Sequence, residues 1–172
     1  MIHSAQRVAF RKLTLSVARF VFSLMSIGGL ACVAYGAEWG AIVPTQSTIE
    51  SVRGRYGEPT KRSTVKVDGY DTTEWVYEGD RAPGGLRRLV VSFGFLTPQG
   101  FRPEIVRTFR LYPLPGIFTQ RTVVLGWGEP SGVGREGGEP ALFYMEGLIV
   151  VFEADGWKVK EMIFTPPQPA AR

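Results

Sequence analysis

The stretch STIESVRGRYGEP at residues 47–59 predicts a short helix with a marked beginning and end. Ser47 and Glu50 form the Ser-x-x-Glu pattern of a capping box, which satisfies free backbone donors at a helix N-terminus. Apolar side chains then recur along one helical face, at Ile49, Val52 and Tyr56. Gly57 supplies the positive φ that commonly closes a helix, and Pro59 prevents the helix from continuing.

The same signals return in TQRTVVLGWGEP at residues 119–130. The apolar face and the Gly-Glu-Pro stop recur in matching places, at Val123, Trp127, Gly128 and Pro130. The cap is expected to be weaker here, because no acid lies three residues after Thr119. Both Gly-Glu-Pro motifs are interpreted as helix stops rather than as binding motifs.

Three strand-like runs follow each Gly-Glu-Pro motif in the same order. The matched pairs are 72–79 with 141–147, 89–93 with 148–152, and 104–113 with 157–166. With the helix and its stop, five elements match in order, which indicates internal duplication. The expected fold class is α+β, with two tandem helix–(β)3 units whose helices pack on one face of an antiparallel sheet.

This pattern divides the chain into four segments. They are a signal peptide at 1–37, a first α+β repeat at 38–113, a second repeat at 114–167 and a disordered tail at 168–172. YPLPGIF at 112–118 is the expected joint between the repeats, because Pro113 and Pro115 interrupt strands.

The first 37 residues have the charge pattern of an export signal. They contain four basic residues and no acid. The uncharged run Phe20–Ala37 is short for a membrane-spanning helix, which needs about 20 apolar residues. Cleavage after Gly36 would leave small residues at the recognition positions. An uncleaved anchor and lipidation of Cys32, which lies in the lipobox-like GLAC, are the alternatives. The expected location is the periplasm, with outer-membrane association as a further expectation.

Charge and residue usage exclude several classes of function. Of 20 basic residues four lie in the leader, so the other 16 balance the 16 acids and leave no basic stripe for nucleic acid. The single histidine, His3, and the single cysteine, Cys32, also lie in the leader. The rest of the chain therefore lacks residues for Ser-His-Asp or Cys-His catalysis and the usual zinc ligands, and no metal or cofactor is expected.

Carboxylates remain as candidates for chemistry. Glu74, Glu78 and Glu146 would serve a carboxylate-based hydrolase or a small-ligand binder, which is the alternative function. Glu78 and Glu146 hold equivalent places in the two repeats, which favours a structural role. Because His and Cys are also missing after residue 37, the chain is expected not to be an enzyme.

The segments TIESVRGRYGEPTK, TTEWVYEG and LRRLVVSF resemble the SmpA/OmlA (BamE) family of small envelope lipoproteins. The resemblance covers residues 45–113 and returns more loosely over 117–166. It implies a helical pair against a three-stranded antiparallel sheet, and binding of partners in outer-membrane protein assembly. A tandem pair of such units also resembles β-lactamase inhibitor protein, in which two repeats form a concave sheet that grips an enzyme. The chain lacks that protein's cysteine pair within each unit.

The expected activity is binding of an envelope protein by side chains that point out of the strands. The candidate contacts are Trp75, Tyr77, Arg87, Arg88, Phe143, Tyr144 and Met145. The alternative for each aromatic residue is a place in the core, because alternate side chains of a strand must point inward. The loops 78–85 and 132–140 are further candidates, with a flexible surface loop as the alternative. A membrane is expected to be contacted only through the signal segment or a lipid anchor.

Overall fold

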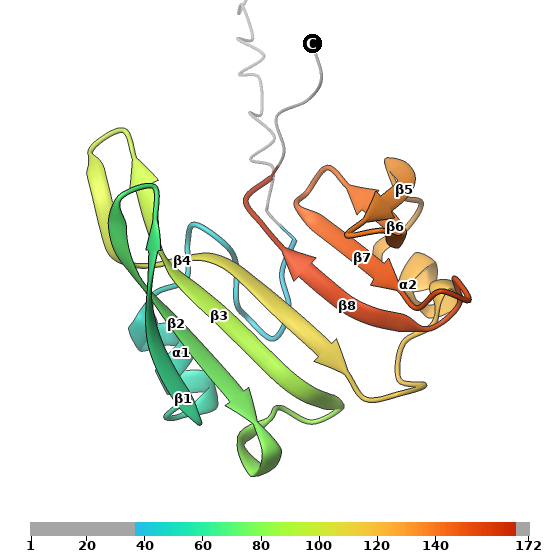
Figure 1. The fold of residues 1–172 in the computed structure, drawn as a ribbon, viewed down its shortest axis with the longest axis horizontal. Helices are drawn as coiled ribbons and strands as arrows, with labels where there is room; N and C mark the ends of the chain where they lie inside the picture. Colours follow the sequence, from blue (N-terminus) through green and yellow to red (C-terminus); the bar gives the residue numbers. More distant parts are fainter. Residues whose placement is uncertain (1–36, 168–172) are drawn as a thin grey trace, which may run out of the picture. The chain divides into compact units, whose positions relative to one another are not determined.

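In the computed structural model, which describes residues 37–167, eight strands form one antiparallel sheet (Figure 1). The expectations for the signal segment, for Cys32 and for the tail at 168–172 lie outside the described residues. Among the residues that are described, no helix is long and apolar enough to cross a membrane.

Each of two helices precedes four strands. The first set is α1 (Ile49–Tyr56), β1 (Lys61–Val67), β2 (Tyr70–Glu78), β3 (Leu86–Thr97) and β4 (Gly100–Pro113), with a short 3₁₀ helix η1 (Gly79–Arg81) between β2 and β3. The second set is α2 (Gln120–Trp127), β5 (Gly132–Glu136), β6 (Glu139–Tyr144), β7 (Leu148–Phe152) and β8 (Val159–Phe164). The strand order is β1-β2-β3-β4-β8-β7-β6-β5, so β4 and β8 join the two sets at the centre of the sheet.

The predicted fold class of two helix–(β)3 units is wrong. The described chain is mainly one eight-stranded antiparallel sheet with two short helices, and each helix is followed by four strands. The strands that were not predicted are β1, KRSTVKV, and β5, GVGRE, which form the two edges. Their side chains are mostly exposed, so their sequences lack the apolar alternation that marks a half-buried strand.

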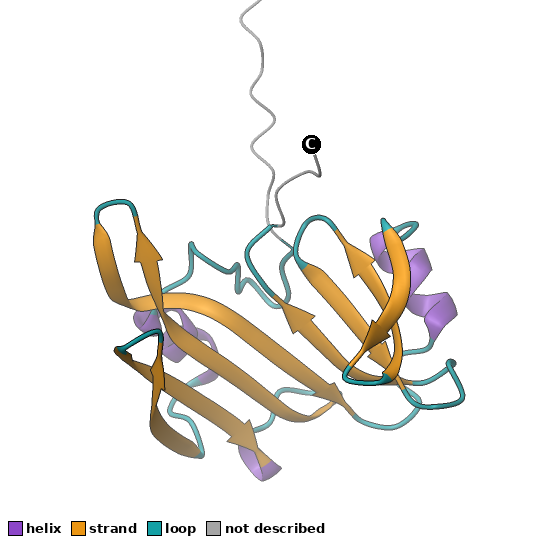
Figure 2. Ribbon diagram, turned by 45° about the horizontal axis from the view of Figure 1, so that its top comes forward, coloured by secondary structure: helices purple, strands orange, loops and turns teal. Residues whose placement is uncertain are grey.

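The main core lies between the sheet and the helices, which both cover the same face (Figure 2). Val52 of α1 and Val123 of α2 are fully buried in this core. Phe109 of β4 and Phe164 of β8 stack at 4.4 Å between ring centroids, across the seam between the two sets of strands. The segment before α1 packs into the same core through Ile42. The core is therefore continuous across the seam.

The helix N-terminus of α1 is capped one residue later than expected. Thr48 accepts a hydrogen bond from the Ser51 N–H at 3.3 Å, and Ser51 Oγ accepts one from the Thr48 N–H at 2.9 Å. Ser47 instead accepts a hydrogen bond from the Val43 N–H at 2.9 Å. The predicted Ser47–Glu50 capping box is therefore wrong, because Thr48 and Ser51 supply both cap hydroxyls.

The second helix has the same cap, made by Thr119 and Thr122. The expectation of a weaker cap is wrong, because a hydroxyl at the third helical position replaces the carboxylate of the usual box.

Both helices end at a glycine with positive φ. Gly57 has φ 72° and ψ −156°, and Gly128 has φ 81° and ψ −167°. The positive φ is as expected, but these ψ values lie outside the left-handed helical region, in a region open almost only to glycine. The carbonyls of these glycines accept hydrogen bonds from the hydroxyls of Tyr77 and Tyr144, at 3.1 and 3.2 Å. The glycine therefore turns the chain so that a tyrosine of the sheet can hold the helix end.

Candidate functional site

The face of the sheet opposite the helices, here called the open face, is the candidate site. Trp75 and Tyr77 point into the helix-side core, so Val76 between them points to the open face. Five apolar side chains are at most 8% exposed yet lie outside the helix-side core, namely Val76, Val90, Ala141, Val151 and Ile163. Larger neighbouring side chains must cover them, because neither helix lies on this side (Figure 2).

The arginine–tyrosine cluster, which consists of Glu78, Arg87, Arg88 and Tyr112, lies where β2 and β4 end and β3 begins. A register shift between Leu86 and Arg88 interrupts the β3·β4 ladder. Such a bulge breaks the usual alternation of side chains, and the guanidinium groups of Arg87 and Arg88 both lie 5.7 Å from the centre of the Tyr112 ring. A surface hollow of about 350 Å³ adjoins these residues.

Ion pairs connect this cluster to its neighbours. Arg88 Nε lies 3.9 Å from Glu78 Oε2, and Arg110 Nη1 lies 3.3 Å from Glu161 Oε1 on β8. Burial raises the pKa of the Tyr112 phenol above its ordinary value, and the nearby Glu161 carboxylate raises it further. The phenol is therefore a neutral hydrogen-bond donor at physiological pH. The region has an excess of positive charge, because it contains three arginines and only two carboxylates. The arginines are Arg87, Arg88 and Arg110, and the carboxylates are Glu78 and Glu161.

An apolar groove lies at the β5–β6 end of the molecule. It has a volume of about 280 Å³, and its walls include Val133, Phe143 and Met145. Val133 is 79% exposed and Met145 is 41% exposed. The Met145 N–H donates a hydrogen bond to Ser131 Oγ at 3.2 Å, which fixes the turn after β6 beside the start of β5. This end of the molecule thus offers apolar contact area next to an edge strand.

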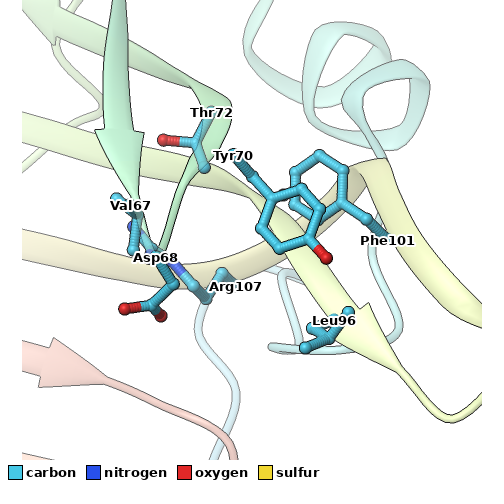
Figure 3. A pocket seen from close by; sticks show the side chains of 8 residues that line it. Val67, Asp68, Tyr70, Thr72, Leu96, Phe101 and Arg107 are labelled. Carbon is cyan, nitrogen blue, oxygen red and sulfur yellow. The ribbon is translucent and has the colours of Figure 1, made fainter.

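A small cavity, here called the hairpin-tip cavity, lies where the β1–β2 and β3–β4 hairpins approach each other (Figure 3). It has a volume of about 60 Å³. Tyr70 and Phe101 stack over it at 4.4 Å between ring centroids, with planes 16° apart. Arg107 Nε is shielded from solvent and has no hydrogen-bond partner among the described residues. A donor in this state typically costs about 1–3 kcal/mol.

Three of the predicted contact residues are core residues. Trp75, Tyr77 and Tyr144 are 2%, 0% and 5% exposed. They point towards the helices, where the two tyrosines hold the glycine stops and Trp75 packs edge-on against Phe93 at 5.0 Å. Their prediction as binding residues is wrong, because the strand register turns them to the covered face.

The other predicted contacts lie at the surface. Arg87, Arg88 and Met145 are exposed, and Phe143 is partly exposed in the apolar groove. The arginines come together with Tyr112, whereas Phe143 and Met145 belong to the far end of the sheet. Tyr112 was not predicted, although its alternation with Arg110 in RLYP would have placed both on one face.

The predicted loops differ from each other in structure. Residues 78–85 contain η1 and remain irregular, whereas residues 132–140 form the β5–β6 hairpin with a turn at Gly137 and Gly138. That turn requires two positive φ values, 57° and 87°, which glycine adopts without strain. The expectation of a flexible loop at 132–140 is wrong for most of its length.

The candidate catalytic acids do not converge. Glu74 and Glu78 lie on β2, where Glu74 contacts Ser92 Oγ at 3.4 Å, whereas Glu146 lies in the β6–β7 turn. Within residues 37–167 no group of three or more His, Cys, Asp or Glu side chains is placed to hold a metal ion.

Comparisons with known proteins give little similarity. No model of a known protein family matches the sequence, and no curated protein sequence matches it. A crystal structure of a DUF4309 family protein (YjgB) from Bacillus subtilis subsp. subtilis str. 168 is similar, with a TM-score of 0.49 and 14% sequence identity. The match covers 77% of this chain and 88% of that chain. Similarity at this level identifies neither a family nor a function.

Proposed function

We propose that this chain is an exported protein-binding module of the cell envelope, and that a partner protein docks on the open face. The observation that carries the proposal is the arginine–tyrosine cluster. Arginine and tyrosine are among the residues that contribute most to binding energy at protein interfaces. In this cluster two arginines and a tyrosine converge on the face of the sheet that neither helix covers.

The size of the open face supports the same proposal. Eight strands at a spacing of about 4.8 Å give a face roughly 34 Å wide. A standard protein–protein interface needs about 800 Å² from each partner, and a face of this width can supply it. The apolar groove at Phe143 and Met145 would supply the apolar part of such an interface.

The charges of the open face indicate the chemistry of the partner. Arg87 makes no ion pair with a described acidic side chain, whereas Glu78 and Glu161 each have an arginine partner. An acidic side chain of the partner would therefore find an unpaired guanidinium, that of Arg87, over the Tyr112 ring. The proposed partner is an envelope protein with an acidic surface patch, and the proposed activity is binding rather than catalysis.

Site-specific cross-linking in cells tests the docking surface. A photoreactive phenylalanine analogue would replace Met145 near the open face, and Leu125, which is 76% exposed on α2, would be the matched control. We expect one protein to be cross-linked from position 145 and not from position 125. Adding Arg87→Glu should abolish that product without lowering the melting temperature, because Arg87 is exposed and makes no ion pair with a described acidic side chain. Cross-linking from position 125 alone, or no effect of Arg87→Glu, would contradict the proposal.

Export is tested independently by mass spectrometry of the envelope fraction. We expect a mature N-terminus near Ala37, because the uncharged run ends there. An acylated N-terminal Cys32 would establish the lipoprotein alternative, and an intact Met1 in a soluble fraction would contradict export.

A further inference from the structure

We propose that the hairpin-tip cavity binds a carboxylate group through the guanidinium of Arg107. The cavity lies at the β1–β2 and β3–β4 hairpin tips, away from the arginine–tyrosine cluster at the opposite ends of these strands. It is thus a second site, and a ligand would bind there independently of a protein partner on the arginine–tyrosine cluster.

Two irregularities of the β3·β4 ladder create the cavity. The register shifts between Phe93 and Phe95, which leaves Gly94 at φ 95°. A Cβ atom at Gly94 would come within 2.9 Å of Phe101 Cζ and 3.1 Å of Thr72 Cγ2. The glycine therefore lets the Phe101 ring close over the strand and stack on Tyr70, so these rings form one wall of the cavity (Figure 3).

The second irregularity positions the arginine. Ser92 pairs with Thr108 and Phe93 pairs with Val106, which leaves Arg107 as the extra residue of a bulge. The Arg107 side chain points towards Val67 and Asp68 in Figure 3, and all three residues line the cavity. No described acidic side chain lies within 4.0 Å of its nitrogens, so Arg107 forms no ion pair within residues 37–167, and its Nε has no hydrogen-bond partner there.

Size and charge favour a carboxylate over other anions. A cavity needs about 10–15 Å³ of volume open to a water-sized sphere to hold one water molecule. This cavity has about 60 Å³, which suits a group of a few heavy atoms. The planar guanidinium matches the two oxygens of a carboxylate. Asp68 also lines the cavity, and its negative charge opposes a dianionic phosphate more strongly than a monoanion.

The side chains that line the cavity indicate which chemical group is attached to the carboxylate. Besides Arg107 and Asp68, the lining includes Val67, Leu96 and the stacked rings of Tyr70 and Phe101. A short apolar stem would contact these side chains while the carboxylate faces Arg107. Two sources have this chemistry, a small free carboxylic acid and the C-terminal residue of a polypeptide.

Nuclear magnetic resonance on the isotope-labelled 172-residue chain tests the site. Propionate is titrated while the Nε–Hε signal of Arg107 is followed, with propionamide as the neutral isostere and inorganic phosphate as the dianion. We expect a saturable shift of the Arg107 signal with propionate and none with propionamide or phosphate at equal concentration.

Three variants separate the site from a general effect of charge. Arg107→Gln should weaken propionate binding roughly tenfold or more, because a charged hydrogen bond is lost. Asp68→Asn should strengthen binding roughly two- to fivefold, because an exposed like charge is removed. Arg102→Gln is the matched control, since Arg102 lies on the same hairpin but is paired with Glu104 at 2.7 Å, and should leave binding unchanged.

The source of the carboxylate is distinguished with a tripeptide that has a free C-terminus and with its C-terminal amide. Tighter binding of the free tripeptide than of propionate assigns a chain terminus, and the reverse assigns a small acid. If the chain with its native arginines gave no cross-link from position 145, the docking proposal would be refuted and the carboxylate site would be unaffected. The carboxylate site would be overturned if no carboxylate gave a saturable shift of the Arg107 Nε–Hε signal. It would also be overturned if the amides bound as tightly as the corresponding carboxylates.

Discussion

The α1 end and the α2 end of the molecule share the contacts that build the fold and differ in the side chains that they expose. Each helix starts at a threonine that exchanges hydrogen bonds with a hydroxyl residue three positions on. Each ends at a glycine whose carbonyl accepts a tyrosine hydroxyl, from Tyr77 at one end and from Tyr144 at the other. These contacts are made mainly by backbone atoms and side-chain hydroxyl groups. The same contacts can therefore form at both ends, although the exposed side chains of the two ends differ.

The outer surfaces of the two ends have different chemistry. Beside α1, the guanidinium groups of Arg53 and Arg62 lie 5.4 and 5.0 Å from the centre of the Trp75 ring, and Glu58 pairs with both arginines. Beside α2, Leu125 is 76% exposed and Trp157 is 64% exposed. We therefore expect the shared contacts to contribute more to stability than the differing surfaces.

The largest expected effect concerns the seam that joins the two ends. Phe109→Ala should lower the free energy of unfolding by about 3–5 kcal/mol, because it removes a fully buried ring that stacks on Phe164. Chemical denaturation followed by tryptophan fluorescence and by circular dichroism should still give one transition. Two separate transitions would show that the two ends are independent domains.

Substitution of either glycine at a helix end should lower the free energy of unfolding less than Phe109→Ala does, and by the same amount at both ends. Gly57→Ala and Gly128→Ala should each cost about 1–3 kcal/mol, because both positions need a backbone conformation that alanine rarely adopts. No atom lies within 4 Å of the added Cβ at either position, so the cost comes from the backbone alone. Thermal unfolding measures it.

Gly54→Ala is the matched control for the glycine stops. Gly54 lies within α1 and has the same free space around its Cβ, so alanine should stabilise the protein by about 0.5–1 kcal/mol. Destabilisation at only one of the two stops would show that the ends are not built alike.

The tyrosine contacts should contribute less. Tyr77→Phe and Tyr144→Phe should each cost about 0.5–1.5 kcal/mol, because each removes one hydrogen bond to a glycine carbonyl. Equal costs in urea denaturation would support the equivalence of the two ends, and a cost at only one end would limit it.

Alkaline pH should destabilise the protein through Tyr77. Burial raises the pKa of Tyr77 from 10.0 to about 12 in the folded protein. The folded state therefore holds this proton more tightly, so its contribution to stability is complete below pH 10 and is lost between pH 10 and about 12. The unfolding free energy should fall over this range, and it should fall less in Tyr77→Phe.

The smallest effect is expected at the differing surfaces. Leu125→Glu should change the free energy of unfolding by no more than about 0.5 kcal/mol, because the side chain is 76% exposed. A larger decrease in the free energy of unfolding, measured by thermal unfolding, would show that the outer surface of α2 does contribute to stability.

The sequence predicted the local features that depend on backbone chemistry. The two helices, the positive φ of Gly57 and Gly128, and most of the apolar strands follow from glycine, proline and β-branched patterns. It could not predict β1 and β5, because these edge strands are exposed and are held by their neighbours rather than by an apolar pattern of their own. The sequence also cannot show that β4 pairs with β8, because that pairing joins residues about 50 positions apart, such as Arg110 and Ile163.

The candidate site was predicted in part. Arg87, Arg88, Phe143 and Met145 do lie at the surface, but Trp75, Tyr77 and Tyr144 do not. The direction of a side chain depends on strand register, which the sequence alone does not fix where a bulge interrupts the alternation. Tyr112 and Arg107 were missed because their importance depends on neighbours that the β3·β4 bulges bring together.

Hydroxyl-radical footprinting shows which face the partner covers, and it uses the unsubstituted chain, which keeps Met145, in a non-covalent complex with the partner that cross-linking identifies. Our account predicts that oxidation of Tyr112, Phe143 and Met145 falls in the complex relative to the free chain, whereas oxidation of Leu125 and Trp157 is unchanged. Protection of Leu125 and Trp157, with Tyr112 and Phe143 still as reactive as in the free chain, would place the partner on the helix side and would contradict the proposed role of the open face.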